Sequence, residues 1–237
     1  MKIVDVISSK SLTGFYFDDQ AAIKSGATQN GFTYVGDPVT NKFTQIRQKG
    51  EAVSIMLVLE DGQIALGDAA AVQYSGAGGR DTLFLSEDGI KTLDKDIRPY
   101  LIGKDISTFK ELAEEIDMLE INGARIHTAL RYGLTQALLD ATAKTHHLTM
   151  SEIIRKEYNI KSTEYNHIPI FAQTGDDRYN NVDKMIIKEV EVMPHALINN
   201  IETKLGYQGE ILKEYVAWLR GRVMQLRTNP EYTPIFH

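Results

Sequence analysis

The sequence predicts an α+β domain over residues 1–160, followed over residues 161–237 by the opening of a parallel βα series. Two β-rich runs separated by turn residues lie in the N-terminal part, and apolar residues then recur every three to four positions through the middle of the chain. From residue 168 onwards, short strand patterns alternate with helical ones. The two parts therefore belong to different fold classes.

The N-terminal part predicts a small antiparallel meander. Residues 2–8 have the pattern of a strand, and residues 53–59 and 63–71 form two more, separated by Asp61 and Gly62, which tolerate the positive φ angles of a tight hairpin turn. A glycine-punctuated excursion covers residues 14–38. Loops of this length are often functional, and a disordered flap is the alternative interpretation.

Helical spacing follows the meander. A first stripe begins after Ser107, a candidate N-cap, and consists of Phe109, Leu112, Ile116 and Leu119. A longer helix is predicted over residues 124–144, with an apolar face made by Ile126, Leu130, Leu134, Leu138 and Ala141. Residues 149–158 predict one more short helix. His146 and His147 end the long helix, where cationic side chains are favoured.

The polar, poorly periodic residues 159–167 mark the boundary between the two parts. The alternating pattern beyond it consists of a strand at 168–172, a helix at 182–190, a strand at 192–198, a helix at 209–227 and the start of a strand at 234–237. Three strands of a parallel series do not close a barrel, so the third keeps an unpaired edge.

Composition excludes several classes of function. A formal net charge of −6 and a pI near 5.6 are atypical of nucleic-acid binding, which needs a basic face. The chain has no cysteine, which excludes disulfides, thiolate zinc sites and cysteine nucleophiles. No apolar run approaches the roughly 20 residues of a membrane span, and no secretory signal is visible. We expect a soluble, cytoplasmic protein.

Polar residues that follow the predicted parallel strands are candidates for a site. Gln173 follows the strand at 168–172, and His195 follows residues 192–194, at the strand ends where barrels place ligand-contacting groups. An imidazole there can move protons near neutral pH. Pattern alone leaves open that Gln173 is an ordinary loop residue and that His195 is structural or solvated.

Other polar clusters receive structural interpretations. We interpret Asp18 and Asp19 as a solvated pair. We interpret Asp176 and Asp177 as the start of a helix rather than as a metal site. The glycine-rich residues 73–81 could approach an anion but lack the spacing of a phosphate loop, so a flexible turn is favoured. The residues themselves predict no metal site.

Four longer strings resemble the methylaspartate ammonia-lyase family of the enolase superfamily. They are LTGFYFDDQ at residues 12–20, AAVQ at 70–73, FAQTGDDRY at 171–179 and PHALINN at 194–200. The resemblance covers the whole chain. It implies an enolase-like capping domain over residues 1–160 and, over residues 161–237, the first three βα units of an incomplete TIM-type barrel, with the active site between them.

The resemblance also implies a reaction and its cations. The family reversibly eliminates ammonia from 3-methylaspartate, a small amino diacid, giving mesaconate in glutamate fermentation. Metal ions stabilise the enolic dianion that forms when the proton beside the carboxylate is removed. The implied cation is Mg²⁺ in the complete enzyme, with K⁺ as a further candidate. The family's three acidic ligands and its lysine base match no residues of this chain.

Three residues take roles from the resemblance by position. His195 matches the histidine opposite the lysine base, Gln173 a ligand of the substrate carboxylate, and Gln73 a capping-domain contact near the amine. We expect this chain to be inactive alone, with a homodimer or a complementary C-terminal barrel fragment as partner. The alternatives are an inactive fragment or split-gene subunit, and another lyase of the enolase superfamily.

Overall fold

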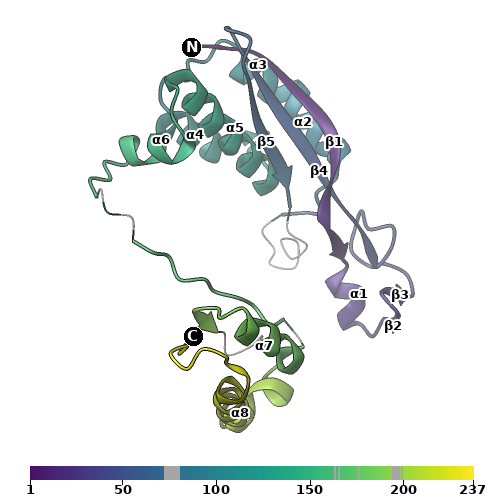
Figure 1. The fold of residues 1–237 in the computed structure, drawn as a ribbon. Helices are drawn as coiled ribbons and strands as arrows, with labels where there is room; N and C mark the ends of the chain where they lie inside the picture. The colour runs from purple at the N-terminus through teal and green to yellow at the C-terminus, as the bar shows by residue number, and fades with distance from the viewer. Residues whose placement is uncertain (72–80, 163, 165, 176, 194–197, 199) are drawn as a thin grey trace. The chain divides into compact units, whose positions relative to one another are not determined.

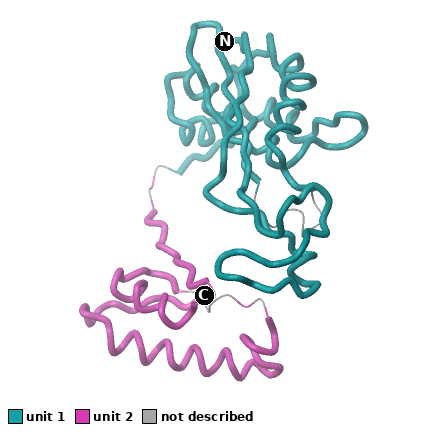
Figure 2. Tube along the Cα trace, turned by 90° about the vertical axis from the view of Figure 1, so that its right-hand side faces the viewer, with its two compact units in different colours: residues 1–162 teal, residues 163–237 magenta. Residues whose placement is uncertain are grey.

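The computed structural model describes residues 1–71, 81–162, 164, 166–175, 177–193, 198 and 200–237. They divide into two compact units, Met1–Ser162 and Thr163–His237 (Figure 2). Each unit has its own cluster of buried apolar side chains.

Unit 1 is built on a three-stranded antiparallel sheet in the order β1-β4-β5 (Figure 1). Its strands are β1 (Ile3–Asp18), β4 (Arg47–Leu59) and β5 (Ile64–Ala70). The predicted hairpin is confirmed, with Gly62 at a φ of 86° in its turn. β1 is longer than the predicted strand at 2–8, because residues beyond Ile7 pair with β4 through backbone bonds while their mostly polar side chains show no apolar alternation.

One face of this sheet packs against helix α5 (Thr128–His146) at very short range. A Cβ atom at Gly67 of β5 would lie 2.0 Å from the carbonyl oxygen of Gly133, and one at Gly133 would lie 2.6 Å from the backbone nitrogen of Ala69. Both positions therefore need glycine, so that the backbones of helix and strand can touch. Beyond this contact, Leu130, Leu134 and Leu138 fill the core as the sequence predicted.

A helical segment that the sequence analysis missed covers the same face. It consists of α2 (Ser86–Thr92), a π-helical turn (Leu93–Ile97) and α3 (Arg98–Leu101). Leu93, Ile97 and Leu101 are fully buried at helical spacing. Gly89 and Pro99 interrupt the pattern. A Cβ at Gly89 would lie 3.0 Å from the ring of Phe84, so this ring would have to shift to admit a side chain there.

Two further helices and a small hairpin complete the α part. They are α4 (Lys110–Met118), the strands β6 (Glu120–Ile121) and β7 (Ala124–Arg125), and α6 (Met150–Glu157). The hairpin explains why α5 starts at Thr128 rather than at the predicted residue 124. His146 and His147 lie at the end of α5, as predicted.

The predicted N-cap at Ser107 is wrong. The N-cap of α4 is Phe109, whose backbone N–H donates to Oε1 of Glu157 at 2.8 Å, while the N–H of Lys110 donates to Oε2 at 2.6 Å. The carboxylate of Glu157, at the end of α6, therefore caps the N-terminus of α4 by accepting hydrogen bonds from two of its free N–H groups. α6 itself begins with a capping box between Thr149 and Glu152.

The excursion over residues 14–38 is structured. It contains the end of β1, helix α1 (Gln20–Lys24) and the hairpin of β2 (Thr28–Asn30) and β3 (Thr33–Val35). The interpretation of Asp18 and Asp19 as a solvated pair is wrong, because their side chains are only 7% and 1% exposed.

Asp18 anchors this excursion to β4. Arg47 donates to Asp18 from Nε at 2.7 Å and from Nη2 at 2.8 Å, and from Nη1 to the carbonyl of Phe32 at 2.7 Å. The guanidinium also lies over the rings of Tyr16 and Phe32, 4.2 and 4.5 Å from their centroids. The Arg47 guanidinium is thus held between these rings and the bidentate carboxylate of Asp18, and it links the β2-β3 hairpin to the sheet.

Asp19 organises the other side of the excursion. Its Oδ1 accepts from the N–H groups of Ala21 and Ala22 at 3.1 and 3.3 Å, which caps α1, and from Oγ1 of Thr40 at 2.6 Å. Its Oδ2 accepts from the N–H groups of Val39 and Thr40 at 2.7 and 2.8 Å. Burial alone would raise the pKa of Asp19, but the hydrogen bonds from Thr40, Val39 and Ala22 lower it below its usual value.

We expect Asp19→Asn to reduce the free energy of unfolding at pH 7 by roughly 1–3 kcal/mol, because an amide cannot accept all these bonds. Since the folded-state pKa is lowered, the ionised group stabilises the fold above the unfolded pKa near 3.9, and this contribution is lost as pH falls through the folded-state pKa. Chemical denaturation of both proteins at pH 7 and pH 3 measures the difference. A difference in unfolding free energy that is no smaller at pH 3 than at pH 7 would contradict the stabilising role of ionised Asp19.

Unit 2 is a small α/β unit. Its elements are α7 (Arg178–Ile187), β8 (Val192–Met193), a π-helical turn (Ile201–Leu205), α8 (Glu210–Leu226) and β9 (Ile235–Phe236). The predicted strand at 192–198 falls partly outside the described residues. α7 and α8 pack together through a core that includes Val182, Ile186, Tyr215 and Leu219. Across the described part of the chain, none of the helices combines the length and apolar character needed to cross a membrane.

Candidate active site

Three short parallel strand segments lie side by side in unit 2. Phe171 forms a parallel bridge with Val192, and β8 pairs in parallel with β9. The N–H of Val192 donates to the carbonyl of Ile170 at 3.0 Å, and that of His237 to the carbonyl of Met193 at 2.9 Å. Because neighbouring parallel strands end at the same edge, the described residues that follow the first and third segments share that edge.

Gln173 lies at this edge, directly beyond the first segment. The N–H of Ala172 donates to the carbonyl of Val192 at 3.4 Å, and the next side chain, Gln173, is exposed. The rings of Phe171 and His237 meet edge-to-face with centroids 6.0 Å apart, so the ends of the first and third segments lie on one side. An exposed amide here can bind a carboxylate without adding charge, and this role of Gln173 stays a prediction.

Hydrogen bonds with residues of α7 fix the loop that follows Gln173. Thr174 is 1% exposed, and its carbonyl accepts from Nδ2 of Asn181 at 2.8 Å. Asp177 is the N-cap of α7 and accepts from the N–H of Asn180 at 3.4 Å, which confirms the predicted helix start for Asp177. Asp176 lies outside the described residues. These bonds fix where the loop joins α7.

Arg178, which the sequence analysis gave no role, is buried at the start of α7, directly after this loop. Its Nη1 donates to the carbonyl of Lys204 at 3.2 Å, and its guanidinium lies 4.8 Å from the ring centroid of Tyr215 on α8. Burial raises the pKa of Tyr215 to about 12, so its hydroxyl stays protonated at neutral pH. Arg178 therefore joins the start of α7 to the residues around Lys204 and to α8.

The opposite, N-terminal ends of the strands carry a structural carboxylate that was also missed. Glu191 precedes β8, and its Oε2 accepts from the N–H of Ile170 at 2.8 Å while its Oε1 lies 2.6 Å from Nε2 of His167. The hydrogen bond from the N–H of Ile170 lowers the pKa of Glu191 most, and the contact with His167 lowers it further. An ionised group at this end of parallel strands is typical of stability rather than of catalysis.

His195 and Gln73 both lie outside the described residues. Gln73 follows β5, and the chain is described again from Asp81, where two contacts anchor it to the start of α5. Oδ1 of Asp81 accepts from the N–H of Thr128 at 3.2 Å, and Nε2 of His127 lies 3.0 Å from the carbonyl of Thr82. The roles of His195 and Gln73 stay predictions.

The described residues do not fit a magnesium site. Among them, no three His, Asp or Glu side chains gather closely enough to hold a metal ion. No step of a reaction is therefore assigned to a metal held by these residues.

Comparison with known proteins decides the family. The family model for the methylaspartate ammonia-lyase N-terminus matches residues 1–159, and the model for the C-terminus of the same enzyme matches residues 162–237. This chain belongs to the methylaspartate ammonia-lyase family. The chain spans 57% of the length of the Clostridium tetanomorphum member, to which it is 64% identical over 237 residues.

Solved members of the methylaspartate ammonia-lyase family have the same fold. A magnesium complex of the C. tetanomorphum enzyme matches the whole chain with a TM-score of 0.92, and a Q73A variant of that enzyme matches with 0.91. The Citrobacter amalonaticus enzyme, solved with (2S,3S)-3-methylaspartic acid, is 53% identical with a TM-score of 0.91, and the chain covers 57% of it.

More distant structures confirm the predicted fold class. A dipeptide epimerase from Methylococcus capsulatus covers 96% of the chain at 17% identity with a TM-score of 0.56, and the chain covers 52% of it. Likeness at this identity concerns the fold alone. The chain therefore has the architecture of the enolase superfamily, a capping domain followed by part of a barrel.

Proposed function

We propose that this chain supplies the capping domain, residues 1–160, and the first barrel strands, residues 161–237, of an enzyme that reversibly eliminates ammonia from 3-methylaspartate. The observation that carries the proposal is the match of the two methylaspartate ammonia-lyase models to residues 1–159 and 162–237. In the reaction, a proton leaves the carbon beside a carboxylate, the bond from the neighbouring carbon to nitrogen breaks, and a carbon–carbon double bond forms. The products are mesaconate and ammonia.

The proposal includes cations, partners and location. The magnesium complex of the C. tetanomorphum enzyme supports Mg²⁺ in the complete enzyme, where it would stabilise the enolic dianion, and K⁺ is proposed as a second cation. The partner would be a polypeptide that carries the remaining barrel strands, a second copy of the chain, or both. A cytoplasmic location agrees with the absence of cysteine.

Three side chains would act on the substrate from this chain. Gln173, at the carboxyl end of the first parallel segment, would donate a hydrogen bond from its amide to the substrate carboxylate. His195 follows the second segment and would move a proton on the face opposite the lysine base. Gln73 would contact the amine from the capping domain, and the existence of a Q73A variant shows that the C. tetanomorphum relative has a glutamine under the same number.

The test of Gln173 uses an assembled enzyme, in which these 237 residues are joined to the part of the C. tetanomorphum relative that the chain does not span. We expect Gln173→Ala to raise KM for 3-methylaspartate by a factor that corresponds to roughly 1–3 kcal/mol, because a buried carboxylate oxygen loses its partner. Steady-state kinetics with Gln173→Glu as the charge-repelling comparison measure this effect.

An unchanged KM and kcat in both Gln173 variants would remove this residue from the site. Gln73→Ala, measured alongside, should weaken binding of 3-methylaspartate more than binding of mesaconate, which has no amine. Equal effects on the two ligands would contradict the proposed contact of Gln73 with the amine.

A further inference from the structure

Strand β5 lies at an edge of the sheet, and side chains of α5 bind three of the backbone groups that point outward along that edge. Alternate residues of an edge strand direct their N–H and C=O groups away from the sheet, where they can pair with another strand. In β5 the N–H of Leu66 donates to Oδ2 of Asp140 at 2.9 Å, and the N–H of Asp68 reaches Oε1 of Gln136 at 3.3 Å.

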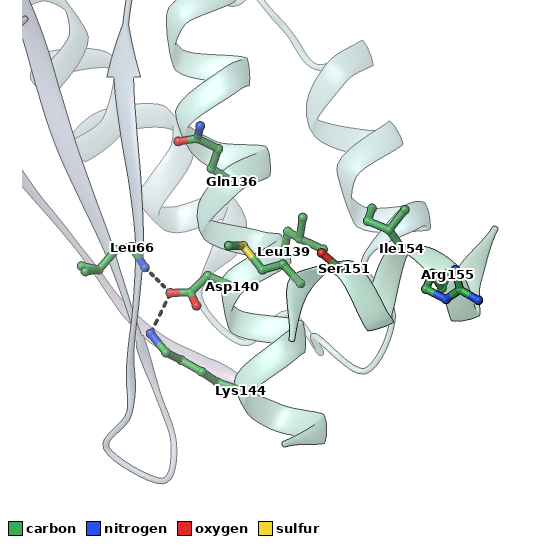
Figure 3. A pocket seen from close by; sticks show the side chains of 9 residues that line it. Leu66, Gln136, Leu139, Asp140, Lys144, Ser151, Ile154 and Arg155 are labelled. Atoms are coloured by element: carbon green, nitrogen blue, oxygen red, sulfur yellow. Dashed lines mark hydrogen bonds and ion pairs between the residues drawn. The ribbon is translucent and has the colours of Figure 1, made fainter. Parts of the chain in front are cut away.

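A lysine of α5 donates a hydrogen bond to a backbone carbonyl on the same edge. Nζ of Lys144 donates to the carbonyl of Ile64 at 2.7 Å. It also donates to Oδ2 of Asp140 at 2.7 Å, next to the bond from Leu66 to the same carboxylate (Figure 3). Gln136, Asp140 and Lys144 are spaced four residues apart, so they form one row along α5. The row reaches the strand because Gly67 and Gly133 let α5 approach β5 to backbone contact.

Without these bonds, β5 would be open to a further strand. A groove of 920 Å³ runs beside it, lined by Leu66 and by side chains of α5 and α6 that include Leu139, Met150 and Ile154. Ile64 and Leu66 are 46% and 58% exposed, so the strand also offers apolar contact. Space and apolar surface are thus present, while three outward backbone groups of the strand are already occupied by side chains of α5.

We propose that Gln136, Asp140 and Lys144 form an edge lock, which closes β5 to strand pairing and keeps copies of this chain from associating through the sheet. Asp140 is its centre, because one carboxylate oxygen both accepts from the strand and binds the lysine. The lock explains why the sheet keeps three strands although its edge strand β5 exposes apolar side chains.

The experiment uses the full 237-residue chain with the Asp140→Ala substitution. Amide hydrogen exchange followed by NMR should show the Leu66 amide exchanging roughly tenfold faster or more, because it loses a charge-assisted bond. The amides of Ala65 and Gly67, which face β4, should keep their protection. Sedimentation velocity should show the variant associating at concentrations where the unsubstituted chain does not associate further.

Two matched variants separate the lock from general destabilisation. Asp117→Ala removes a carboxylate that has two arginine partners elsewhere in unit 1, and it should leave Leu66 exchange and association unchanged. Leu66→Lys added to Asp140→Ala places a charge on the open edge, and it should restore the original association state while exchange at position 66 stays fast.

Three results would overturn the proposal. The first is unchanged Leu66 exchange in Asp140→Ala, and the second is faster exchange with no more association than in Asp117→Ala. The third is a double variant that associates as strongly as Asp140→Ala, because association would then not involve β5.

Discussion

Replacing His195 by alanine in the assembled enzyme should lower kcat for 3-methylaspartate roughly 10²- to 10⁴-fold, the contribution of a positioned proton-transfer group. The residue follows β8, the second of three parallel segments whose carboxyl ends meet at one edge with Gln173. An imidazole there can take up or release a proton near neutral pH. Because the proposed lysine base would act on the opposite face, the loss should differ between the two diastereomers of the substrate.

Steady-state kinetics on both diastereomers measure this effect, and His167→Ala is the matched control. His167 is 69% exposed and pairs with Glu191 at the opposite ends of the same strands. Its loss should leave kcat unchanged. Kinetics of His195→Ala that equal those of the unsubstituted enzyme on both diastereomers would remove His195 from the mechanism, while circular dichroism verifies that both variants fold.

The sequence predicted those elements whose own residues carry a periodic signal. The hairpin around Gly62 and the helices α5 and α8 were expected, because apolar alternation or helical spacing persists over their length. The segment from α2 to α3 was missed although Leu93, Ile97 and Leu101 keep helical spacing, since Gly89 and Pro99 break the pattern. Local pattern therefore failed where packing against the sheet overrides local propensity.

Long-range side-chain contacts had no local signal. The pairing of Asp18 with Arg47 and the capping of α4 by Glu157 join residues far apart in the chain, and pattern alone predicted a solvent-exposed Asp18. At the site, the strand-end position of Gln173 followed from the alternation of strand and helix, whereas the roles of Gln173, His195 and Gln73 came from resemblance alone. Buried anchors such as Arg178 were missed because nothing in their sequence context distinguishes them from exposed charges.

The largest effect of all is expected from adding the rest of the barrel. In the described residues no three acidic or histidine side chains gather to hold Mg²⁺, so nothing among them would stabilise the enolic dianion. Without that stabilisation, the proton beside the carboxylate is too weakly acidic for an imidazole to remove. A polypeptide of these 237 residues should therefore show no lyase turnover alone and should gain it with the missing part.

The most direct measurement follows the ultraviolet absorbance of mesaconate in a solution of the purified 237-residue chain, Mg²⁺ and 3-methylaspartate. The same assay is run after adding a polypeptide that supplies the part of the C. tetanomorphum relative not spanned by this chain. We predict no turnover by the chain alone and magnesium-dependent turnover by the complex, whose formation is verified by sedimentation. Turnover by the isolated chain, or an inactive complex, would contradict the proposed function.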